Sequence, residues 1–191
     1  DGLYAMIDIG SATLDICTFR LNKNEAGDDR YNIFTAEICP FGVEAESWFA
    51  QEGKTTDEFQ YQCEWQRNRV IWSTKKDRDR SASCWNPDER LPAFVCGGGA
   101  KNPLHRRVID NLDPWLRQTV KNDGLNEIVI DKPRQLDMVV DDAEFSRLAV
   151  AWGLSFPRLM IGDVIPPSAI NNMEARPARD IGANFVSKDD V

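Results

Sequence analysis

The chain opens with apolar segments separated by a turn of small residues. Residues 3–9 are mainly apolar and include Asp8 near their end, residues 10–13 are Gly-Ser-Ala-Thr, and apolar and polar positions then alternate up to residue 21. Alternation is typical of a strand with one buried face, and Gly and Ser are typical of tight turns. The pattern therefore predicts a β-hairpin with strands at 3–9 and 13–21.

Later segments change between strand-like alternation and helical periodicity. A polar loop at 22–30 precedes a third predicted strand at 31–38. Asn102 and Pro103 are residues preferred at the beginning of a helix. The other elements predicted are a helix from about residue 43, a long helix at 57–80, a strand at 93–96, helices from residues 103 and 113, a strand at 126–133 and a helix at 141–156.

This order of elements predicts the fold class. Three successive strands followed by two strand–helix units favour an α/β domain with a mixed five-stranded sheet, three strands antiparallel and then two parallel, flanked by helices. The domain is expected at residues 1–156, with a variable helical region at about 43–92. From residue 157 to 191 the periodicity is lost and prolines accumulate, which predicts a C-terminal extension or a linker.

Composition narrows the class of protein. A net charge of −8 disfavours a general nucleic-acid surface. No apolar run reaches the roughly 18 residues that cross a membrane. The five cysteines lack the spacing of a zinc site, which favours a reducing cytoplasm. Because the chain begins at Asp1 without an initiator Met and enters a strand at once, we expect it to be a fragment of a longer protein.

The single histidine and the tryptophans of the middle region have two interpretations each. His105 is the only histidine, which disfavours a Ser-His-Asp triad, and its place in a helix predicts a surface residue. We expect the tryptophans to lie in the core; the alternative is a surface that binds a protein partner. These tryptophans are Trp48, Trp65, Trp72 and Trp85.

The first turn combines residues that suit a phosphate. Small residues let backbone N–H groups converge on an anion, and Ser11 and Thr13 add hydroxyl groups. Asp8 would repel a phosphate unless Mg²⁺ lies between them, because Mg²⁺ bridges carboxylates and phosphate oxygens. An ordinary hairpin turn is the alternative.

A second turn also contains residues that suit a bound ligand. The sequence FVCGGGAKNPL reads as a buried strand, three glycines and the beginning of a helix. Glycines in that place allow a ligand to approach the backbone and the helix N-terminus. One glycine would satisfy a tight turn, so three in a row predict a flat ligand against the backbone.

Three segments together resemble the actin-like ATPase superfamily, which includes actin, heat-shock chaperone ATPases, plasmid-segregation filaments and sugar kinases. AMIDIGSATLDICTF resembles the second phosphate hairpin of that family, and its matching residues are Asp8, Gly10, Ser11, Thr13 and Asp15. FVCGGGAKNPL is similar to the adenosine motif. RLAVAWGLS is similar to the last helix of the fold, where Ala149 and Gly153 would permit close helix packing. The resemblance covers about residues 3–156.

The resemblance implies a ribonuclease H-like domain that binds ATP and Mg²⁺. Asp8 would position hydrated Mg²⁺. On the helix before the adenosine motif, Glu64, Arg67 and Lys75 are candidate nucleotide contacts, and structural roles are their alternative. The remaining implied residues are Gly10, Ser11, Ala12 and Thr13 for the phosphates and Gly97, Gly98, Gly99 and Lys101 for the adenosine.

Departures from the family limit the expected activity. The first phosphate loop and the first connecting helix are absent, so the chain resembles the C-terminal half alone. We expect ATP hydrolysis in the full-length parent and none in this chain, because only one wall of the site is present. The alternatives are half of a sugar or acid kinase, or a non-hydrolysing interaction module, which Ala12 in place of the usual glycine favours. The expected partners are an adenine nucleotide, the missing N-terminal half and a protein bound by the variable helical region.

Overall fold

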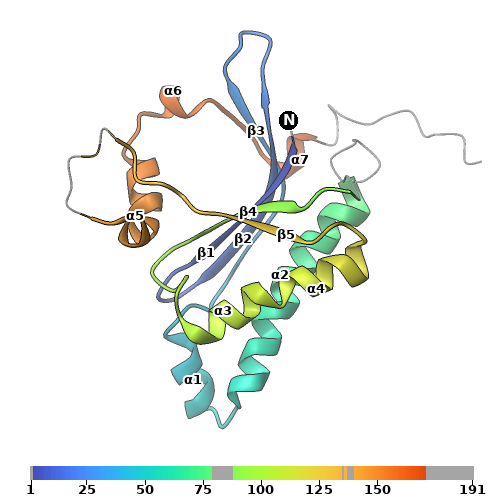
Figure 1. Cartoon of the computed structure of the whole chain (residues 1–191), viewed down its shortest axis with the longest axis vertical. Helices are drawn as coiled ribbons and strands as arrows, with labels where there is room; N and C mark the ends of the chain where they lie inside the picture. Colours follow the sequence, from blue (N-terminus) through green and yellow to red (C-terminus); the bar gives the residue numbers. More distant parts are fainter. Residues whose placement is uncertain (1, 79–87, 135, 137–139, 171–191) are drawn as a thin grey trace, which may run out of the picture.

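The computed structural model describes residues 2–78, 88–134, 136 and 140–170. These residues form an α/β fold with one mixed sheet flanked by helices (Figure 1). The strands are β1 (Gly2–Ile9), β2 (Leu14–Lys23), β3 (Asp29–Cys39), β4 (Leu91–Cys96), β5 (Leu125–Ile128) and β6 (Asp163–Ile165). The helices are α1 (Ala45–Gln51), α2 (Thr56–Arg78), α3 (Pro103–Asp110), α4 (Leu112–Trp115), the π-helix η1 (Leu116–Val120), α5 (Asp142–Leu154), α6 (Arg158–Ile161) and α7 (Pro167–Ile170).

The sheet has the order β5-β4-β1-β2-β3-β6. β1, β2 and β3 form an antiparallel meander, whereas β4 and β5 run parallel to β1. The predicted mixed sheet is confirmed, but the predicted number of five strands is wrong. The sixth strand, β6, pairs with β3 in parallel and has only three residues, which is too short to produce a recognisable alternation.

One face of the sheet carries the hydrophobic core. Every second residue of β1 is buried, namely Leu3, Ala5, Ile7 and Ile9. These residues belong to one core cluster with apolar side chains of α2 and α3, including Phe59 and Val108. Burial of this apolar surface, about 25 cal/mol for each Å², fixes which face of β1 and β2 points inward.

The opposite face of the sheet carries an aromatic row. Tyr4 stacks on Phe19 and on Phe94, with ring centroids 5.6 and 5.9 Å apart, and Phe19 also contacts Tyr31 at 6.2 Å. α5 contacts the sheet at β4. The two faces of the sheet are therefore different: one is sealed by α2 and α3, and the other is partly open around its aromatic residues.

The boundaries of three predicted segments differ from those in the structure. The predicted helix at 113–124 is instead α4 followed by the π-helix η1, which ends at Lys121 in a left-handed conformation with φ 65°. The predicted strand at 126–133 ends at Ile128, five residues before Pro133. The segment from residue 157, for which an extension or a linker is predicted, contributes α6, β6 and α7, and Ile170 lies in the core.

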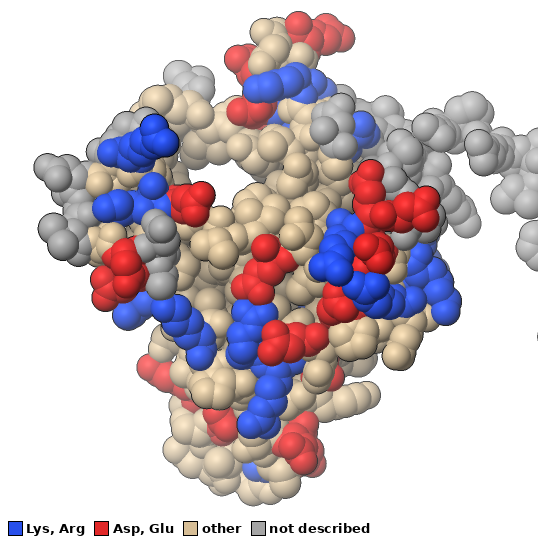
Figure 2. All heavy atoms as spheres, in the orientation of Figure 1, with Lys and Arg blue, Asp and Glu red and all other residues tan. Residues whose placement is uncertain are grey.

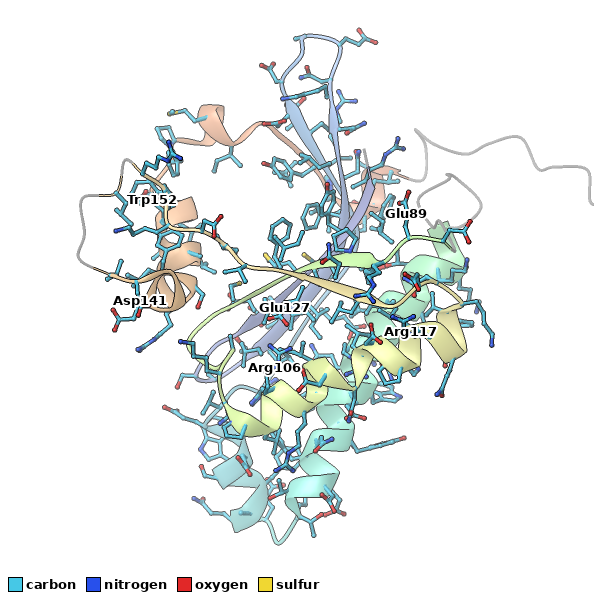
Figure 3. All side chains as sticks on the ribbon, viewed as in Figure 1. Glu89, Arg106, Arg117, Glu127, Asp141 and Trp152 are labelled. Carbon is cyan, nitrogen blue, oxygen red and sulfur yellow. The ribbon has the colours of Figure 1, made fainter. Side chains whose placement is uncertain are left out.

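Charged side chains brace the edge of the sheet at β5. Arg106 of α3 donates to both carboxylate oxygens of Glu127 on β5, at 2.9 and 2.7 Å (Figure 3). Arg117 pairs with Asp113 and Asp123 at 2.9 Å. On the face drawn in Figure 2, acidic and basic residues are interspersed. No helix in the described ranges is both long enough and apolar enough to cross a membrane.

The prediction of a surface histidine is wrong, because His105 is 1% exposed. The two ring nitrogens lie 2.8 Å from the carbonyl oxygen of Phe41 and 3.2 Å from Oδ1 of Asn102. Asn102 caps α3 and accepts the N–H groups of Leu104 and His105. His105 therefore joins the beginning of α3 to the segment that follows β3.

Acidification is expected to destabilise the fold through His105. Burial lowers the pKa of this imidazole below its ordinary value of 6.5, against smaller opposite effects of the Phe41 carbonyl and Glu46. A lowered folded-state pKa means that the unfolded chain binds the proton more readily, so stability is complete above pH 6.5 and is lost as the pH falls below it. Between about pH 7.5 and 5.5 we expect a loss of stability that stays below about 1.4 kcal/mol, the limit for one proton over the pH unit below 6.5.

Urea unfolding at the two pH values measures this loss. The His105→Gln variant is the control, since it has no group that titrates at this position. Equal losses in the two proteins would contradict the assignment to His105.

The tryptophans of the helical region also depart from their prediction. Trp48, Trp65 and Trp72 are 46%, 46% and 44% exposed, so the prediction of a core position is wrong for these three. Trp85 lies outside the described residues. On α2 the inward face is already filled by Phe59, Cys63, Val70 and Ile71, and Trp65 and Trp72 lie on the other side of the helix.

Candidate functional site

The turn between β1 and β2 is held from one side by the segment that leads to α1. The amide N–H groups of residues 42–44 donate to the carbonyl oxygens of residues 10–12 at 2.9–3.1 Å. A Cβ at Gly42 would lie 2.5 Å from backbone atoms of the turn, so only glycine allows this approach. The carbonyl groups of residues 10–12 therefore point to the segment 42–44, and that of Thr13 accepts from the N–H of Gly10 at 2.9 Å.

The amide groups of the same turn point the other way. In a planar trans peptide the C=O and the N–H point in opposite directions. The N–H groups of Ser11, Ala12 and Thr13 therefore point away from the segment 42–44, and Ser11 and Ala12 are exposed. In the described part of the chain no backbone carbonyl accepts from the amides of Ser11 and Ala12. Converging, unbonded N–H groups are a recurrent anion-binding arrangement.

The glycine turn after β4 meets the end of β1. Gly99 donates its N–H to the carbonyl oxygen of Ile9 at 2.8 Å, and Gly97 donates to the carbonyl oxygen of Ser146 on α5 at 3.1 Å. β1 and β4 are parallel and adjacent, so both turns lie at the carboxyl ends of these strands. Open α/β sheets commonly bind ligands at that end.

Packing requires two of the three glycines, Gly97 and Gly99, and not Gly98. Gly97 is buried with φ 88°, and a Cβ there would overlap the carboxylate of Asp8 and the carbonyl group of Ile9. A Cβ at Gly99 would overlap Ile9 and lie 2.6 Å from Val43. Gly98 is exposed, and its Cβ would meet only Nε of Arg147 at 3.8 Å. Packing therefore accounts for two of the glycines and leaves the third unexplained.

Two carboxylates face each other beside this junction. Asp8 and Asp15 are directly opposite in the β1–β2 pairing, on the face of the sheet that carries the aromatic row. Burial and the neighbouring Asp15 raise the pKa of the Asp8 carboxyl, and a hydrogen bond from Cys96 acts in the other direction. Oδ1 of Asp15 is buried without a hydrogen-bond partner in the structure. Like charges opposite each other destabilise a sheet, so the pair would be relieved by a cation.

The candidate contacts from α2 lie away from the glycine turn. Glu64 accepts a hydrogen bond of 2.7 Å from Asn111, at the C-terminal end of α3, whereas the glycine turn precedes the N-terminal end of α3. The eight residues of α3 separate the two places by about 12 Å. Arg67 is 1% exposed and donates to the carbonyl oxygen of Val108, so its guanidinium is used inside the fold. Lys75 lies two turns farther along α2.

The structure adds residues that the sequence analysis did not select. Lys101, which the sequence did suggest, is exposed two positions after the last of the three glycines. Arg147 of α5 approaches Gly98, which lies 49 positions earlier in the chain. No local sequence pattern could have indicated this proximity. Asp15 was noted only as part of a motif, but its unpaired oxygen places it beside Asp8 as a candidate cation ligand.

Comparison with known proteins does not identify the chain. The sequence matches no protein-family model, and a search of curated proteins finds no match. Within the described residues, no group of three or more His, Cys, Asp or Glu side chains is arranged to hold a metal ion. The chemistry of the site therefore rests on its own geometry: outward amides, an open glycine turn and a carboxylate pair.

Proposed function

We propose that this chain is the nucleotide-binding half of an actin-like ATPase of the chaperone or filament type. The observation that carries the proposal is the junction of the two turns, in which outward amides at residues 11–13 and the open Gly98 lie at the carboxyl ends of adjacent parallel strands. The turn at 10–13 would bind the phosphates of ATP. Residues 97–99, with Lys101 and Arg147, would bind the adenosine.

The sheet supports the ribonuclease H-like part of this proposal. The resemblance to the family implies three antiparallel strands followed by two parallel strands, and β1 to β5 have this arrangement. β6 is an addition at the edge of β3. The four cysteines that the structure describes are free thiols, which fits a reducing compartment such as the cytoplasm.

The carboxylate pair fits the magnesium ion that such a site uses. Mg²⁺ prefers oxygen ligands, keeps several water molecules and needs only one or two protein carboxylates beside the phosphates. Asp8 and Asp15 would hold the hydrated ion, and the unpartnered Oδ1 of Asp15 is an acceptor for its water. The ion would neutralise the phosphate charge, while the backbone amides at 11–13 fix the phosphate position.

α5 supports the requirement for a second half. Val150 and Leu154, one turn apart on α5, are 38% and 78% exposed, and a Cβ at Gly153 beside them would have no neighbour within 4 Å among the described residues. A helix with such a face is expected to pack against another surface. We propose that the N-terminal half of the fold covers it, and that hydrolysis needs both halves.

One observation favours the second candidate, a non-hydrolysing interaction module. Ala12 lies exposed in the turn, where its Cβ would stand beside an approaching phosphate oxygen. If the chain is such a module, its fold serves protein binding. Half of a sugar or acid kinase is a separate alternative, in which the parent protein is an enzyme. Nucleotide binding separates the first candidate from this module.

Thermal melting with Mg²⁺ and ATP tests the proposed function. Because the chain would supply about half of the contacts, we expect a dissociation constant of roughly 1 mM. ATP at ten times this value should stabilise the fold by about 1.4 kcal/mol and raise the melting temperature by a few degrees. The shift should be smaller when EDTA removes Mg²⁺. A melting temperature that ATP leaves unchanged would contradict the proposal and favour the interaction module.

Asp8→Asn should separate stability from binding. Without ligand, the variant is expected to be more stable by about 0.5–1 kcal/mol, because the repulsion from Asp15 disappears. With ATP, the Mg²⁺-dependent part of the melting shift should be lost. Asp131→Asn, at an exposed carboxylate away from β1, is the matched control and should change neither quantity. A variant that is less stable and keeps the Mg²⁺ effect would show that Asp8 has a structural role only.

A further inference from the structure

The long helix α2 is apolar on two opposite faces. Its inner face packs in the core, and its outer face carries Tyr61, Trp65 and Trp72, which are 63%, 46% and 44% exposed. Together with Asn68 these residues follow the spacing i, i+4, i+7 and i+11, which is the heptad spacing of a helix that packs along another helix. We call these four residues the outer stripe.

Two residues of the outer stripe, Trp65 and Asn68, are held in place by neighbouring side chains. The guanidinium of Arg69 lies over the ring of Trp65 at 4.1 Å, and Arg69 is itself held by an ion pair with Glu37. Asn68 accepts hydrogen bonds of 2.8 and 3.0 Å from the buried Arg67. Aromatic side chains that are fixed before binding lose little entropy on association, which is typical of interface anchors.

Charges at the two ends of α2 have opposite signs. Asp57 and Glu58 lie in its first turn, and Lys75 and Lys76 lie near its C-terminal end. Asp57 and Lys76 are equally far from the midpoint between Gln66 and Arg67, and so are Glu58 and Lys75. The outer stripe has the same symmetry, since Tyr61 and Trp72, like Trp65 and Asn68, are equally far from that midpoint.

From this symmetry we propose that the outer stripe binds a second copy of this chain, with the two α2 helices antiparallel about a twofold axis. A twofold axis at the midpoint of α2 makes the surface self-complementary, as a symmetric dimer requires. Tyr61 of each copy then faces Trp72 of the other. Asp57 and Glu58 face Lys75 and Lys76 at both ends of the contact.

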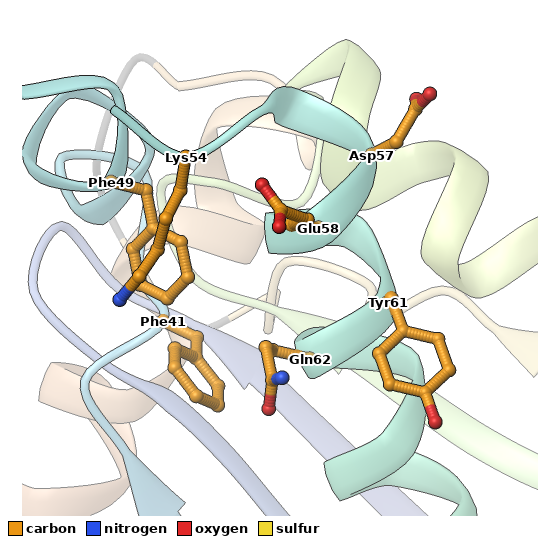
Figure 4. Close-up of a pocket in the computed structure, with 7 residues that line it drawn as sticks. All are labelled: Phe41, Phe49, Lys54, Asp57, Glu58, Tyr61 and Gln62. Carbon is orange, nitrogen blue, oxygen red and sulfur yellow. The ribbon is translucent and has the colours of Figure 1, made fainter. Parts of the chain in front are cut away.

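A pocket lies where the second copy's Trp72 would arrive. It has a volume of about 710 Å³, and its lining includes the rings of Phe41, Phe49 and Tyr61 (Figure 4). Asp57, Glu58 and Lys54 also line the pocket, and the ammonium group of Lys54 is paired with Glu52 at 2.6 Å. The aromatic rings suit an indole ring, and the two carboxylates of α2 suit the second copy's Lys76, which follows its Trp72 by one helical turn.

The charge pattern favours a second copy over a different helical protein. An unrelated helix needs to match only the aromatic residues, whereas a copy related by the axis matches the aromatic row and both charged ends at once. Because one helix from each copy forms the contact, the buried area is small, and we expect a weak dimer. This inference is independent of nucleotide binding.

Sedimentation velocity of the full chain, from about 5 to about 500 μM, measures the association. We expect a concentration-dependent equilibrium between monomer and dimer. Trp72→Glu should weaken it about thirty-fold or more, as removal of an interface anchor does. Leu154→Glu, an equally drastic change at an exposed position of α5, is the matched control and should have no effect.

Charge exchange tests the antiparallel register. Lys75→Glu with Lys76→Glu, and separately Asp57→Lys with Glu58→Lys, should each weaken the dimer, and mixing the two variants should restore it. Glu58 also caps α2 by accepting the N–H of Thr55 at 2.7 Å, so its replacement affects folding. The variant with all four changes lacks the same cap, and it should dimerise better than Asp57→Lys with Glu58→Lys.

Three results would overturn the inference. The chain would remain monomeric at the highest concentration, Leu154→Glu would disrupt the dimer as strongly as Trp72→Glu, or the mixed charge variants would fail to associate while each remains folded by its melting curve. The first result would leave the outer stripe to a different protein.

Discussion

Gly97→Ala is expected to lower the free energy of unfolding by about 3 kcal/mol or more. Gly97 has φ 88°, a conformation that costs an L-residue 1 kcal/mol or more by itself. The added Cβ would also overlap the carboxylate of Asp8 and the carbonyl group of Ile9, at the point where β1 and β4 meet. The carbonyl group of Ile9 cannot move without disturbing the sheet, so the strain and this overlap add.

Urea unfolding of Gly97→Ala and Gly98→Ala gives the comparison. Gly98 is exposed, has no positive φ, and its Cβ would lie 3.8 Å from one flexible side chain. The change at Gly98 should therefore stay within about 0.5 kcal/mol of the unmodified protein. Similar losses in both variants would mean that the two glycines have the same structural role, contrary to the geometry.

Gly98→Val is expected to abolish nucleotide binding while the fold survives. If adenosine lies against the backbone of the glycine turn, a branched side chain at its open position occupies the space of the ligand. Ser11→Ala should have a smaller effect of about 1 kcal/mol, because the hydroxyl is lost and the outward amides of the phosphate turn remain. The two variants thus compare the contributions of the glycine turn and of the phosphate turn to nucleotide binding.

Melting curves with and without Mg²⁺ and ATP separate fold from site. Without ligand, Gly98→Val and the unmodified protein should melt within a few degrees of each other. With ATP, the unmodified protein and Ser11→Ala should shift, and Gly98→Val should not. If Gly98→Val keeps the whole ATP-induced shift, the adenosine site is not at residues 97–99.

Local patterns predicted β1, β2 and the beginning of α3 well. The alternation in 3–9 and 14–21 identifies β1 and β2, because a period of two fixes the buried face of each strand. Asn102 and Pro103 identify the beginning of α3 for an equally local reason, a side-chain cap and a proline in the first turn. β6, with three residues, offers too little chain for any periodicity.

Burial of single residues was predicted less well, because it depends on contacts between distant segments. His105 is buried only because the carbonyl group of Phe41 is available to its ring. On α2 the inner and outer faces are both apolar, so periodicity alone could not assign Trp65 and Trp72 to the surface. Arg67 is similar: its partner, the carbonyl group of Val108, lies 41 positions away.

The sequence indicates the two turns as candidate ligand sites, but it does not reveal the contacts that join them. Three glycines suggested a ligand, but two of them are explained by the close approach of β1, the segment 42–44 and Asp8. The outward direction of the amides at 11–13 depends on hydrogen bonds from residues 42–44, which the sequence does not reveal. Arg147 reaches Gly98 only through the packing of α5.

Amide chemical shifts of the full chain during a titration with Mg²⁺ and ATP show whether the two turns bind the nucleotide. The largest changes are expected at Ser11, Ala12, Thr13 and Gly98, and those of residues 11–13 should shrink when Mg²⁺ is removed. The opposite result is equally clear. If these amides do not respond at several times the expected dissociation constant of roughly 1 mM, or if the changes gather around Phe41 and Phe49 instead, the two turns do not form a nucleotide site.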